Sequence, residues 1–318
     1  MKICRVVTPG FFSTVQDLGR YGYQRFGVPV SGAMDTYALT AANLLVGNKR
    51  EDACLEMTLL GPRLEFLKET LISITGAALS PVIGGAPVCC WQTLQVGEGD
   101  VLSFGAPQSG CRAYLAVRGG IDVPMVMGSR STYVRGGFGG FQGRKMKTGD
   151  VIEAHTPRNA TKSGRFMPKE FIPRYSRAWT IDVVLGPQSH YLTDSGLDDF
   201  FSSFFTVAAE SDRMGYRLDG ARVAQKSSLK IVSDAIPVGA IQVPPSGKPI
   251  VVMRDGQTTG GYPKVAMIST PDISRIGQAK SSDKIRFTKI SLGKAQTKLL
   301  KYRRNLRDMK TQLIETKL

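Results

Sequence analysis

Short apolar runs separated by glycine-containing turns predict β-strands along most of the chain. Between residues 53 and 150 the predicted strands are 54–60, 64–66, 71–75, 82–83, 94–96, 101–104 and 113–117. Similar runs follow at 179–185 and 249–253. Strands of this length and spacing are typical of an antiparallel sheet that closes on itself or packs against a second sheet. The pattern therefore predicts a mainly β protein with a few helices.

One helix is predicted in the first half of the chain. Residues 36–46 are largely apolar, follow Asp35 as a natural N-cap and end before Gly47 and Asn48. Asn43 lies among apolar neighbours inside this helix. Because a buried amide needs hydrogen-bond partners, we expect Asn43 to tie the helix to a neighbouring loop.

A second helix is predicted in the C-terminal tail. Apolar residues recur there at steps of three and four among many Lys and Arg residues, namely Leu299, Tyr302, Leu306, Met309 and Leu313. This spacing predicts a basic amphipathic helix. Such a helix could pack against its own chain, dock onto a partner protein or lie on an anionic membrane surface.

These patterns divide the chain into four parts. Residues 1–154 are predicted as an N-terminal β-rich module with one helix, and residues 179–290 as a C-terminal β module. The segment 155–178 has few periodic apolar positions and several Pro, Lys and Arg residues, so it is predicted as a basic linker. Residues 291–318 form the basic helical tail.

The net charge of +16 is concentrated in two of these regions. Residues 144–178 carry nine Lys or Arg against three Asp or Glu, and residues 291–318 carry eight against two. The rest of the chain has a net charge of only +4. A nucleic-acid groove needs basic residues interleaved with exposed aromatics on the folded surface, so we expect no nucleic-acid partner.

The apolar runs are too short for a membrane segment, and the spacing of the cysteines does not suggest disulfides. No stretch of eighteen apolar residues and no secretory leader pattern is found, so we expect a cytoplasmic protein without a membrane partner. The five cysteines lack C-x-x-C spacing and lie mostly among apolar residues: Cys4, Cys54, Cys89, Cys90 and Cys111. They are predicted to be buried, reduced thiols.

The strongest candidate site is the segment 251–264, where an apolar run gives way to charged, hydroxyl and glycine residues. Gly260 and Gly261 allow backbone N–H groups to approach a ligand closely. The same spacing also suits a glycine-rich turn between two strands. As a site, its catalytic candidates are Asp255, Tyr262 and Lys264. The candidates for substrate binding are Gln242, Arg213, Gln257, Thr258, Thr259, Gly260, Gly261, Gln16, Asp17 and Arg20.

The chemistry of these residues suits a small planar amide. Gln242 can both donate to and accept from an amide, and Lys264 and Arg213 can hold an anion. Asp255 can take a proton from nitrogen or orient the group that does.

Several other chemistries are disfavoured by the sequence. It has no phosphate-loop motif and no zinc-binding motif, and only His155 and His190 are available for a Ser-His-Asp triad. The glycine-dense segment 129–143 fails the dinucleotide pattern; its two arginines could contact a phosphate or carboxylate, or the segment could be a solvated loop. The segment 145–147 does not match a biotin acceptor, so we expect no covalent biotin on this chain.

Ordered motifs from about residue 6 to residue 287 resemble the allophanate hydrolase subunit 2 family. They are TVQDLGR at 14–20, SGAMD at 31–35, ANLLVGN at 42–48, GSRST at 128–132, SDRMGY at 211–216, GAIQVPP at 239–245 and DGQTTGGYPK at 255–264. The family includes the C subunit of 5-oxoprolinase, KipA-type proteins and the carboxyltransferase region of urea carboxylase. The resemblance implies cyclophilin-like β-barrel modules, the second of them over residues 179–290.

The resemblance also implies a function within a hetero-oligomeric complex. Similar stand-alone proteins act with a B-type partner (allophanate hydrolase subunit 1 or KipI-like) and an A-type partner (LamB/YcsF-type). Together these form an ATP-dependent 5-oxoprolinase. ATP and Mg are expected as cofactors that bind with the help of a partner protein. The alternatives are a biotin-dependent carboxyltransferase acting on urea or a similar small amide, and a KipA-like regulator that binds a kinase inhibitor.

Two departures from the family pattern stand out. The family usually has arginine after the aspartate of the central motif, whereas this chain has Gly256 there and Arg254 before the aspartate. Residues 280–283 also replace the family's usual Arg-Pro-Gly-Asp turn. If the family's arginine contacts an anion, the first change bears directly on activity.

Overall fold

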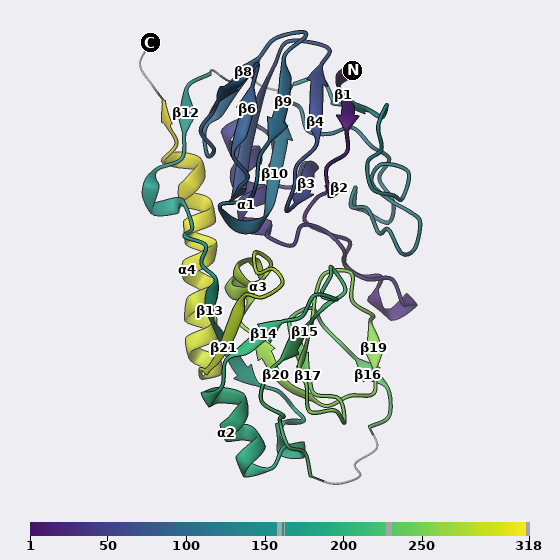
Figure 1. Ribbon diagram of the computed structural model, residues 1–318, viewed down its shortest axis with the longest axis vertical. Helices are drawn as coiled ribbons and strands as arrows, with labels where there is room; N and C mark the ends of the chain where they lie inside the picture. Colours follow the sequence, from purple (N-terminus) through teal and green to yellow (C-terminus); the bar gives the residue numbers. More distant parts are fainter. Residues whose placement is uncertain (158–160, 162, 227–230, 316–318) are drawn as a thin grey trace. The chain divides into compact units, whose positions relative to one another are not determined.

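The computed structural model describes residues 1–157, 161, 163–226 and 231–315, and the chain divides into two compact units. Unit 1 comprises Met1–Arg20, Ser31–Tyr175 and Arg304–Leu318, and unit 2 comprises Tyr21–Val30 and Ser176–Arg303. Figure 1 shows the strands and helices of both units.

Unit 1 contains two antiparallel sheets. The six-stranded sheet has the order β11 (Val151–Glu153), β1 (Lys2–Thr8), β4 (Arg63–Phe66), β9 (Val101–Phe104), β6 (Pro81–Ile83) and β7 (Ala86–Pro87). The five-stranded sheet has the order β2 (Phe12–Gln16), β3 (Cys54–Thr58), β10 (Ser109–Val117), β5 (Thr70–Ala78) and β8 (Thr93–Val96). Alternate residues of both sheets share one buried apolar cluster, which includes Val6, Leu64, Ile74 and Leu115.

The helix α1 (Thr36–Leu45) packs against β5 and β10 and shares an apolar cluster with Tyr114 and Ala116. The carboxylate of Asp35 accepts hydrogen bonds from the backbone N–H groups of the first turn, which confirms the predicted N-cap. The amide of Asn43 donates to the backbone carbonyl of Asp52 over 2.7 Å, so the predicted tie to a neighbouring loop is also confirmed.

The segment predicted as a linker contributes to the core of unit 1. It contains β12 (Arg165–Phe166) and the short helix η2 (Lys169–Phe171). Met167 and Phe171 are buried in the apolar cluster of α1. Apolar burial therefore makes residues up to Tyr175 part of unit 1.

The predicted C-terminal amphipathic helix is confirmed as α4 (Leu292–Thr311). Met309 is fully buried in the α1 cluster of unit 1, and Leu306 packs against the same cluster. Earlier in the helix, the Lys298 ammonium forms ion pairs with Asp182, at 2.6 Å, and with Asp272 in unit 2. The helix thus packs against its own chain, the first of the three alternatives. A short strand, β22 (Ile314–Glu315), follows it and pairs with β12.

Unit 2 is built on a closed seven-stranded barrel. Its strands follow the order β13 (Ala178–Leu185), β20 (Lys264–Ile268), β17 (Ala240–Gln242), β18 (Ile250–Val252), β15 (Gly215–Asp219), β14 (Phe205–Val207) and β21 (Lys284–Lys289). The other elements are β16 (Asp234–Ala235), β19 (Thr259–Gly260), α2 (Asp194–Ser202), α3 (Thr270–Ile276), η1 (Gln24–Phe26) and η3 (Ser189–Tyr191). Phe200 of α2 stacks on Phe287 of β21 with ring centroids 4.8 Å apart. The prediction of a mainly β fold with barrel architecture is confirmed.

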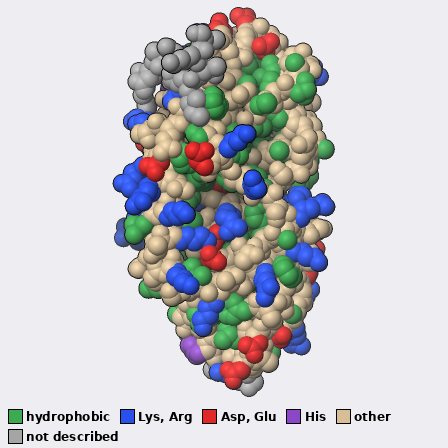
Figure 2. Space-filling view, turned by 90° about the vertical axis from the view of Figure 1, so that its left-hand side faces the viewer, with side chains coloured by type: hydrophobic (Ala, Val, Ile, Leu, Met, Phe, Trp, Pro, Cys, Tyr) green, Lys and Arg blue, Asp and Glu red, His purple; other side chains and the backbone are tan. Residues whose placement is uncertain are grey.

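Lys and Arg side chains are exposed on the face of the molecule that Figure 2 presents. Figure 2 shows Lys and Arg side chains scattered across the side of the molecule on which α4 lies. Among the helices that the structure describes, none is both long enough and apolar enough to cross a membrane.

The cysteine prediction needs one correction. Cys4, Cys54 and Cys111 are buried, but Cys89 is exposed and Cys90 is half-buried, because both lie just beyond the paired residues of β7. None of these five cysteines, all of which lie among the described residues, is in a disulfide. Burial raises the pKa of the Cys4 thiol to about 12 and that of Cys90 to about 11, so both remain protonated at neutral pH.

Candidate functional site

The central loop of unit 2, residues 253–263, connects β18 to β20 at one end of the barrel. Its base is tied to the segment before β15, because the N–H of Met253 donates to the Met214 carbonyl over 2.9 Å and the N–H of Asp255 donates to the Arg213 carbonyl over 2.8 Å. Further along, β19 pairs with β16. These backbone contacts give the loop a defined conformation in spite of its glycines.

Arg213 and Asp255 form a buried ion pair with two hydrogen bonds. Arg213 Nε lies 2.8 Å from Asp255 Oδ2, and Nη2 lies 3.1 Å from Oδ1. Each residue is only 6% exposed. Both carboxylate oxygens are thus engaged by the guanidinium, an arrangement that favours positioning of the loop over proton transfer by Asp255.

Lys264 is a buried cation and the first residue of β20. Its ammonium donates to the carboxylate of Asp234 and, over 2.9 Å, to the carbonyl of Ala235 on β16. The hydrogen bond from Lys264 lowers the pKa of the exposed Asp234 below its usual value. An ammonium has three N–H donors, so one donor of Lys264 is left for a ligand.

Gln242 lies opposite Lys264 in the barrel, because β17 pairs with β20 in this register. Its amide is buried and donates to the carbonyl of Tyr262 over 3.1 Å. A Cβ atom at Gly260 would lie 2.9 Å from Gln257 Nε2 and 3.4 Å from Gln242 Nε2. The missing side chain at Gly260 therefore lets two amide groups approach the loop backbone.

The outer part of the loop faces solvent. Gln257, Thr259, Gly261 and Tyr262 are exposed, the last to 44%, whereas Thr258 is half-buried. The structure thus brings together Gln242, Gln257, Gly260 and Lys264 and places the Tyr262 side chain at the surface.

The three candidates from residues 14–20 belong to unit 1, where they have partners of their own. Gln16 donates to the carbonyl of Thr132 over 3.2 Å. Asp17 accepts hydrogen bonds from Ser129 Oγ over 2.7 Å and from the N–H of Arg130 over 2.6 Å.

Arg20 has a similar internal role. It donates to the carbonyl of Ser131 over 2.8 Å and lies 5.0 Å above the ring of Phe138. Together the three side chains fix the loop 126–138 within unit 1, which is the role of a scaffold.

Unit 2 contains a cavity of about 260 Å³ beside the central loop. It is lined by Tyr21, Gln24, Pro29, Val30, Ile236, Pro237, Val238, Val252, Met253, Arg254, Gly256, Thr258, Thr270 and Ile273. The walls are largely apolar with a few polar groups, the composition typical of a small-molecule site. We call it the loop cavity.

Arg254 and Tyr21 are the functional candidates that the sequence analysis did not identify. In the sequence Arg254 stands out only as a departure from the family motif, although it directly follows the apolar run 249–253. Nothing in the sequence pointed to Tyr21, which reaches unit 2 through the fold of residues 21–30.

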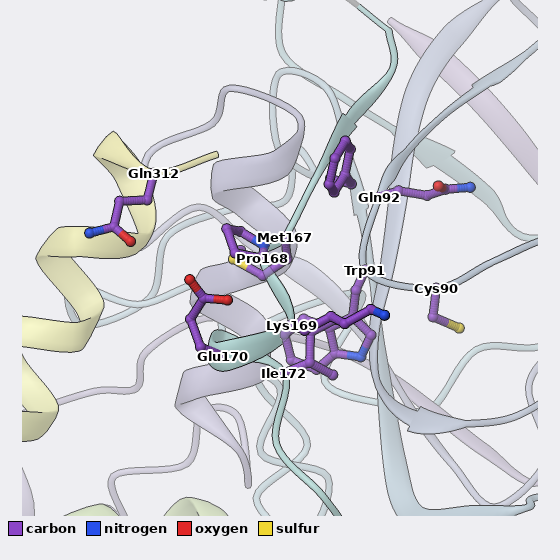
Figure 3. Close-up of a pocket in the computed structure, with 10 residues that line it drawn as sticks. Cys90, Trp91, Gln92, Met167, Pro168, Lys169, Glu170, Ile172 and Gln312 are labelled. Carbon is purple, nitrogen blue, oxygen red and sulfur yellow. The ribbon is translucent and has the colours of Figure 1, made fainter. Parts of the chain in front are cut away.

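A second cavity, of about 630 Å³, lies in unit 1 (Figure 3). Trp91, Met167, Pro168 and Ile172 supply apolar walls, and Gln312 reaches it from the end of the α4 segment. None of the site residues predicted from the sequence lines this cavity. The polar groups that suit an amide are therefore those of unit 2.

Among the residues that the structure describes, no group of three or more His, Cys, Asp or Glu side chains is arranged to hold a metal ion.

Unit 2 thus combines a closed β-barrel with a polar glycine-rich loop and a small cavity, within a mainly β protein. Residues 26–289 match the model of the family described as the carboxyltransferase domain, subdomain A and B. The chain belongs to this family.

Relatives of two architectures were found. The chain is 37% identical over 291 residues to the 5-oxoprolinase C subunit of Escherichia coli K12, covering 92% of each chain. It is 36% identical over 307 residues to urea amidolyase of Lachancea kluyveri, covering 90% of this chain but only 17% of that one. The Kluyveromyces lactis urea carboxylase structure superimposes with a TM-score of 0.92 at 32% identity, covering all of this chain and 30% of that one.

Proposed function

We propose that this chain is the C subunit of an ATP-dependent 5-oxoprolinase, acting with A-type and B-type partners to convert 5-oxo-L-proline to L-glutamate. The proposal rests on a match that extends over nearly the full length of both this chain and its relative. The chain and the Escherichia coli 5-oxoprolinase C subunit each cover 92% of the other, whereas the urea amidolyase match is a small part of a much longer chain. The proposal places the chain in a complex, because its relative is named as a subunit.

The geometry of unit 2 supports an amide substrate. Lys264 keeps one N–H donor for the amide oxygen, which carries the partial negative charge of the amide and is the atom that would take the phosphoryl group. Gln242 lies beside it and can both donate to and accept from the amide group. Asp255 acts through Arg213 by holding the loop that carries these groups.

The loop cavity does not fit a nucleoside triphosphate. Its volume is about 260 Å³, and its walls are apolar except for a few groups, of which Arg254 alone is cationic. We therefore assign ATP and Mg²⁺ to the partner proteins. In the proposed reaction the amide oxygen takes the terminal phosphoryl group of ATP and ADP leaves. One water then opens the ring by breaking the C–N bond, and a second water releases the phosphate to give glutamate.

The test is glutamate release from 5-oxo-L-proline by the assembled A, B and C subunits with ATP and Mg²⁺. Lys264→Met removes the donor and should lower the rate by roughly 10- to 100-fold, because a hydrogen bond from a charged group contributes about 1.5–3 kcal/mol. The matched control is Lys248→Met, since Lys248 pairs with Asp219 at the surface, with the lysine side chain 61% exposed. That control should keep full activity.

A second candidate, carboxyl transfer to urea, is favoured by the superposition on urea carboxylase. This reaction needs carboxybiotin carried by another chain. Release of glutamate supports the first proposal, and urea carboxylation without glutamate release, in the presence of a carboxybiotin donor, supports the second. Assembly of the three proteins with neither activity would favour the KipA-like regulatory role instead.

A further inference from the structure

Arg254 is a buried cation without an acidic partner among the residues that the structure describes. The residue is only 7% exposed. Its Nη1 donates to the hydroxyl of Tyr21 over 3.3 Å, and its Nε is buried with no hydrogen-bond partner. Two residues of similar burial nearby, Arg213 and Lys264, each have a carboxylate partner. Arg254 therefore stands apart among the buried cations of the site.

A buried charge without a counterion is costly to a folded protein. Desolvation of an ionised group amounts to several kcal/mol unless an opposite charge and hydrogen bonds offset it. Arginine keeps its charge at all physiological pH values, so it cannot avoid this cost by losing a proton. A site that retains such a residue beside a cavity is complete only when an anion enters.

The loop cavity has the shape and composition to receive that anion. Arg254 lines it, and none of its fourteen lining residues is Asp or Glu. Thr258 and Thr270 add hydroxyl groups, and the remaining walls are mostly apolar. At about 260 Å³ the cavity lies just below the range of roughly 300–1,000 Å³ usual for small-molecule sites, so its ligand is small.

Gly256 keeps this wall of the cavity free of a side chain. A Cβ atom there would lie 2.5 Å from Val252 Cγ1 and 2.8 Å from the Met214 carbonyl oxygen. Arginine at position 256, as in the usual family motif, would collide with the backbone that this chain adopts. The cation of the loop is instead supplied two residues earlier, by Arg254.

We propose that the loop cavity binds the carboxylate of a small monoanionic ligand through Arg254. One guanidinium balances one carboxylate charge and can donate two parallel hydrogen bonds to it. A phosphate dianion would leave a second charge unbalanced among apolar walls, and a neutral ligand would leave Arg254 unpaired. The identification of this ligand with 5-oxo-L-proline rests on the proposed function, whereas binding of a small carboxylate does not.

The inference is tested by calorimetric titration of the full chain with four probes. These are 5-oxo-L-proline, 2-pyrrolidinone (the same lactam ring without the carboxylate), cyclopentanecarboxylate (a ring carboxylate without the amide) and inorganic phosphate. The two carboxylates should bind at least roughly tenfold more tightly than the other two probes. 2-Pyrrolidinone lacks the charge-assisted hydrogen bond, and phosphate brings a second negative charge that one guanidinium does not balance.

Three variants test whether Arg254 is the residue that binds the carboxylate. Arg254→Met should weaken binding of both carboxylates roughly 10- to 100-fold and leave 2-pyrrolidinone unchanged. Arg254→Lys keeps the charge and should retain part of the affinity, although lysine cannot form the two-pronged contact. Arg217→Met removes an exposed arginine of β15 and should bind every probe like the unmodified chain.

Thermal unfolding separates an anion site from a structural arginine. Without ligand, Arg254→Met should unfold at the same temperature as the unmodified chain or higher, since it removes an unpaired buried charge. Cyclopentanecarboxylate should raise the unfolding temperature of the unmodified chain and of Arg217→Met, and should raise that of Arg254→Met much less. Unchanged carboxylate binding by Arg254→Met, or tighter binding of phosphate than of either carboxylate, overturns the proposal.

The assembled complex distinguishes this inference from the proposed function. If the complex releases glutamate and Arg254→Met leaves the KM for 5-oxo-L-proline unchanged, the carboxylate site is wrong and the function stands. If the isolated chain binds cyclopentanecarboxylate through Arg254 but the complex releases no glutamate, the site stands and the function is wrong.

Discussion

The buried pair of Arg213 and Asp255 makes the sharpest prediction about what holds the central loop in place. Asp255→Asn removes the charge from one partner and leaves a guanidinium that is 6% exposed without its carboxylate. Breaking a buried ion pair on one side costs about 3–5 kcal/mol, because the remaining charge stays desolvated. The free energy of unfolding of unit 2 should fall by that amount.

The double variant tests whether the two side chains act together. Arg213→Met should cost a similar amount, but Arg213→Met with Asp255→Leu should cost less than the sum of the two single changes by about 2 kcal/mol or more. The reason is that replacing both partners by apolar residues removes the desolvation penalty together with the attraction.

Urea unfolding followed by tryptophan fluorescence measures this free energy for unit 2 alone. The chain has two tryptophans, Trp91 in unit 1 and Trp179 in unit 2, so a Trp91→Phe background leaves one reporter. With m near 1–3 kcal/mol per molar urea, the midpoint of Asp255→Asn should fall by about 1 M or more. Single and double variants whose costs simply add would refute the reasoning, and Asp255 would then have to act directly on the substrate.

Three further predictions concern other parts of the fold. Burial acts to raise the pKa of Asp272, but hydrogen bonds from Lys298 and Arg275 outweigh it and lower that pKa. The ionised Asp272 therefore stabilises the folded state above the pKa of an unfolded aspartate, near 4, and this contribution is lost as the pH falls. The urea midpoint of the unmodified protein should drop more steeply below pH 4 than that of Asp272→Asn. Gly256→Ala should reduce stability by about 1–3 kcal/mol in thermal unfolding, because its Cβ would collide with neighbouring backbone; an unchanged melting temperature would contradict the packing described for the loop. Mass spectrometry after brief alkylation of the native chain should find Cys89 modified before any buried thiol, since only its sulfur belongs to an exposed residue.

Local patterns predicted the elements well. The apolar runs gave the strands, and Asp35 with Gly47 marked the ends of α1 closely. The tail stripe predicted α4, including the burial of Met309. These features depend on residues within a few positions of one another, and their physical causes, capping and amphipathic burial, can be read from one segment.

The arrangement of the site could be predicted only in part. The central motif directed attention to Gln242, Gly260 and Lys264, which the structure does bring together. The partner of Asp255 could not be predicted, because Arg213 is 42 residues away and is brought to it by the barrel. The lack of a carboxylate beside Arg254, among the residues that the structure describes, depends on how distant segments fold around it, so it could not be predicted from a local pattern.

The measurement that tests the central claim most directly is a competition between two substrates in one reconstituted complex. The A, B and C subunits receive 5-oxo-L-proline and urea together, with ATP, Mg²⁺, bicarbonate and a biotin carrier protein with its biotin carboxylase, and both glutamate and carboxylated urea are quantified. We expect glutamate release that requires this chain and is lowered by Lys264→Met but not by Lys248→Met. Carboxylation of urea without glutamate, or glutamate release that continues when this chain is omitted, would contradict the account.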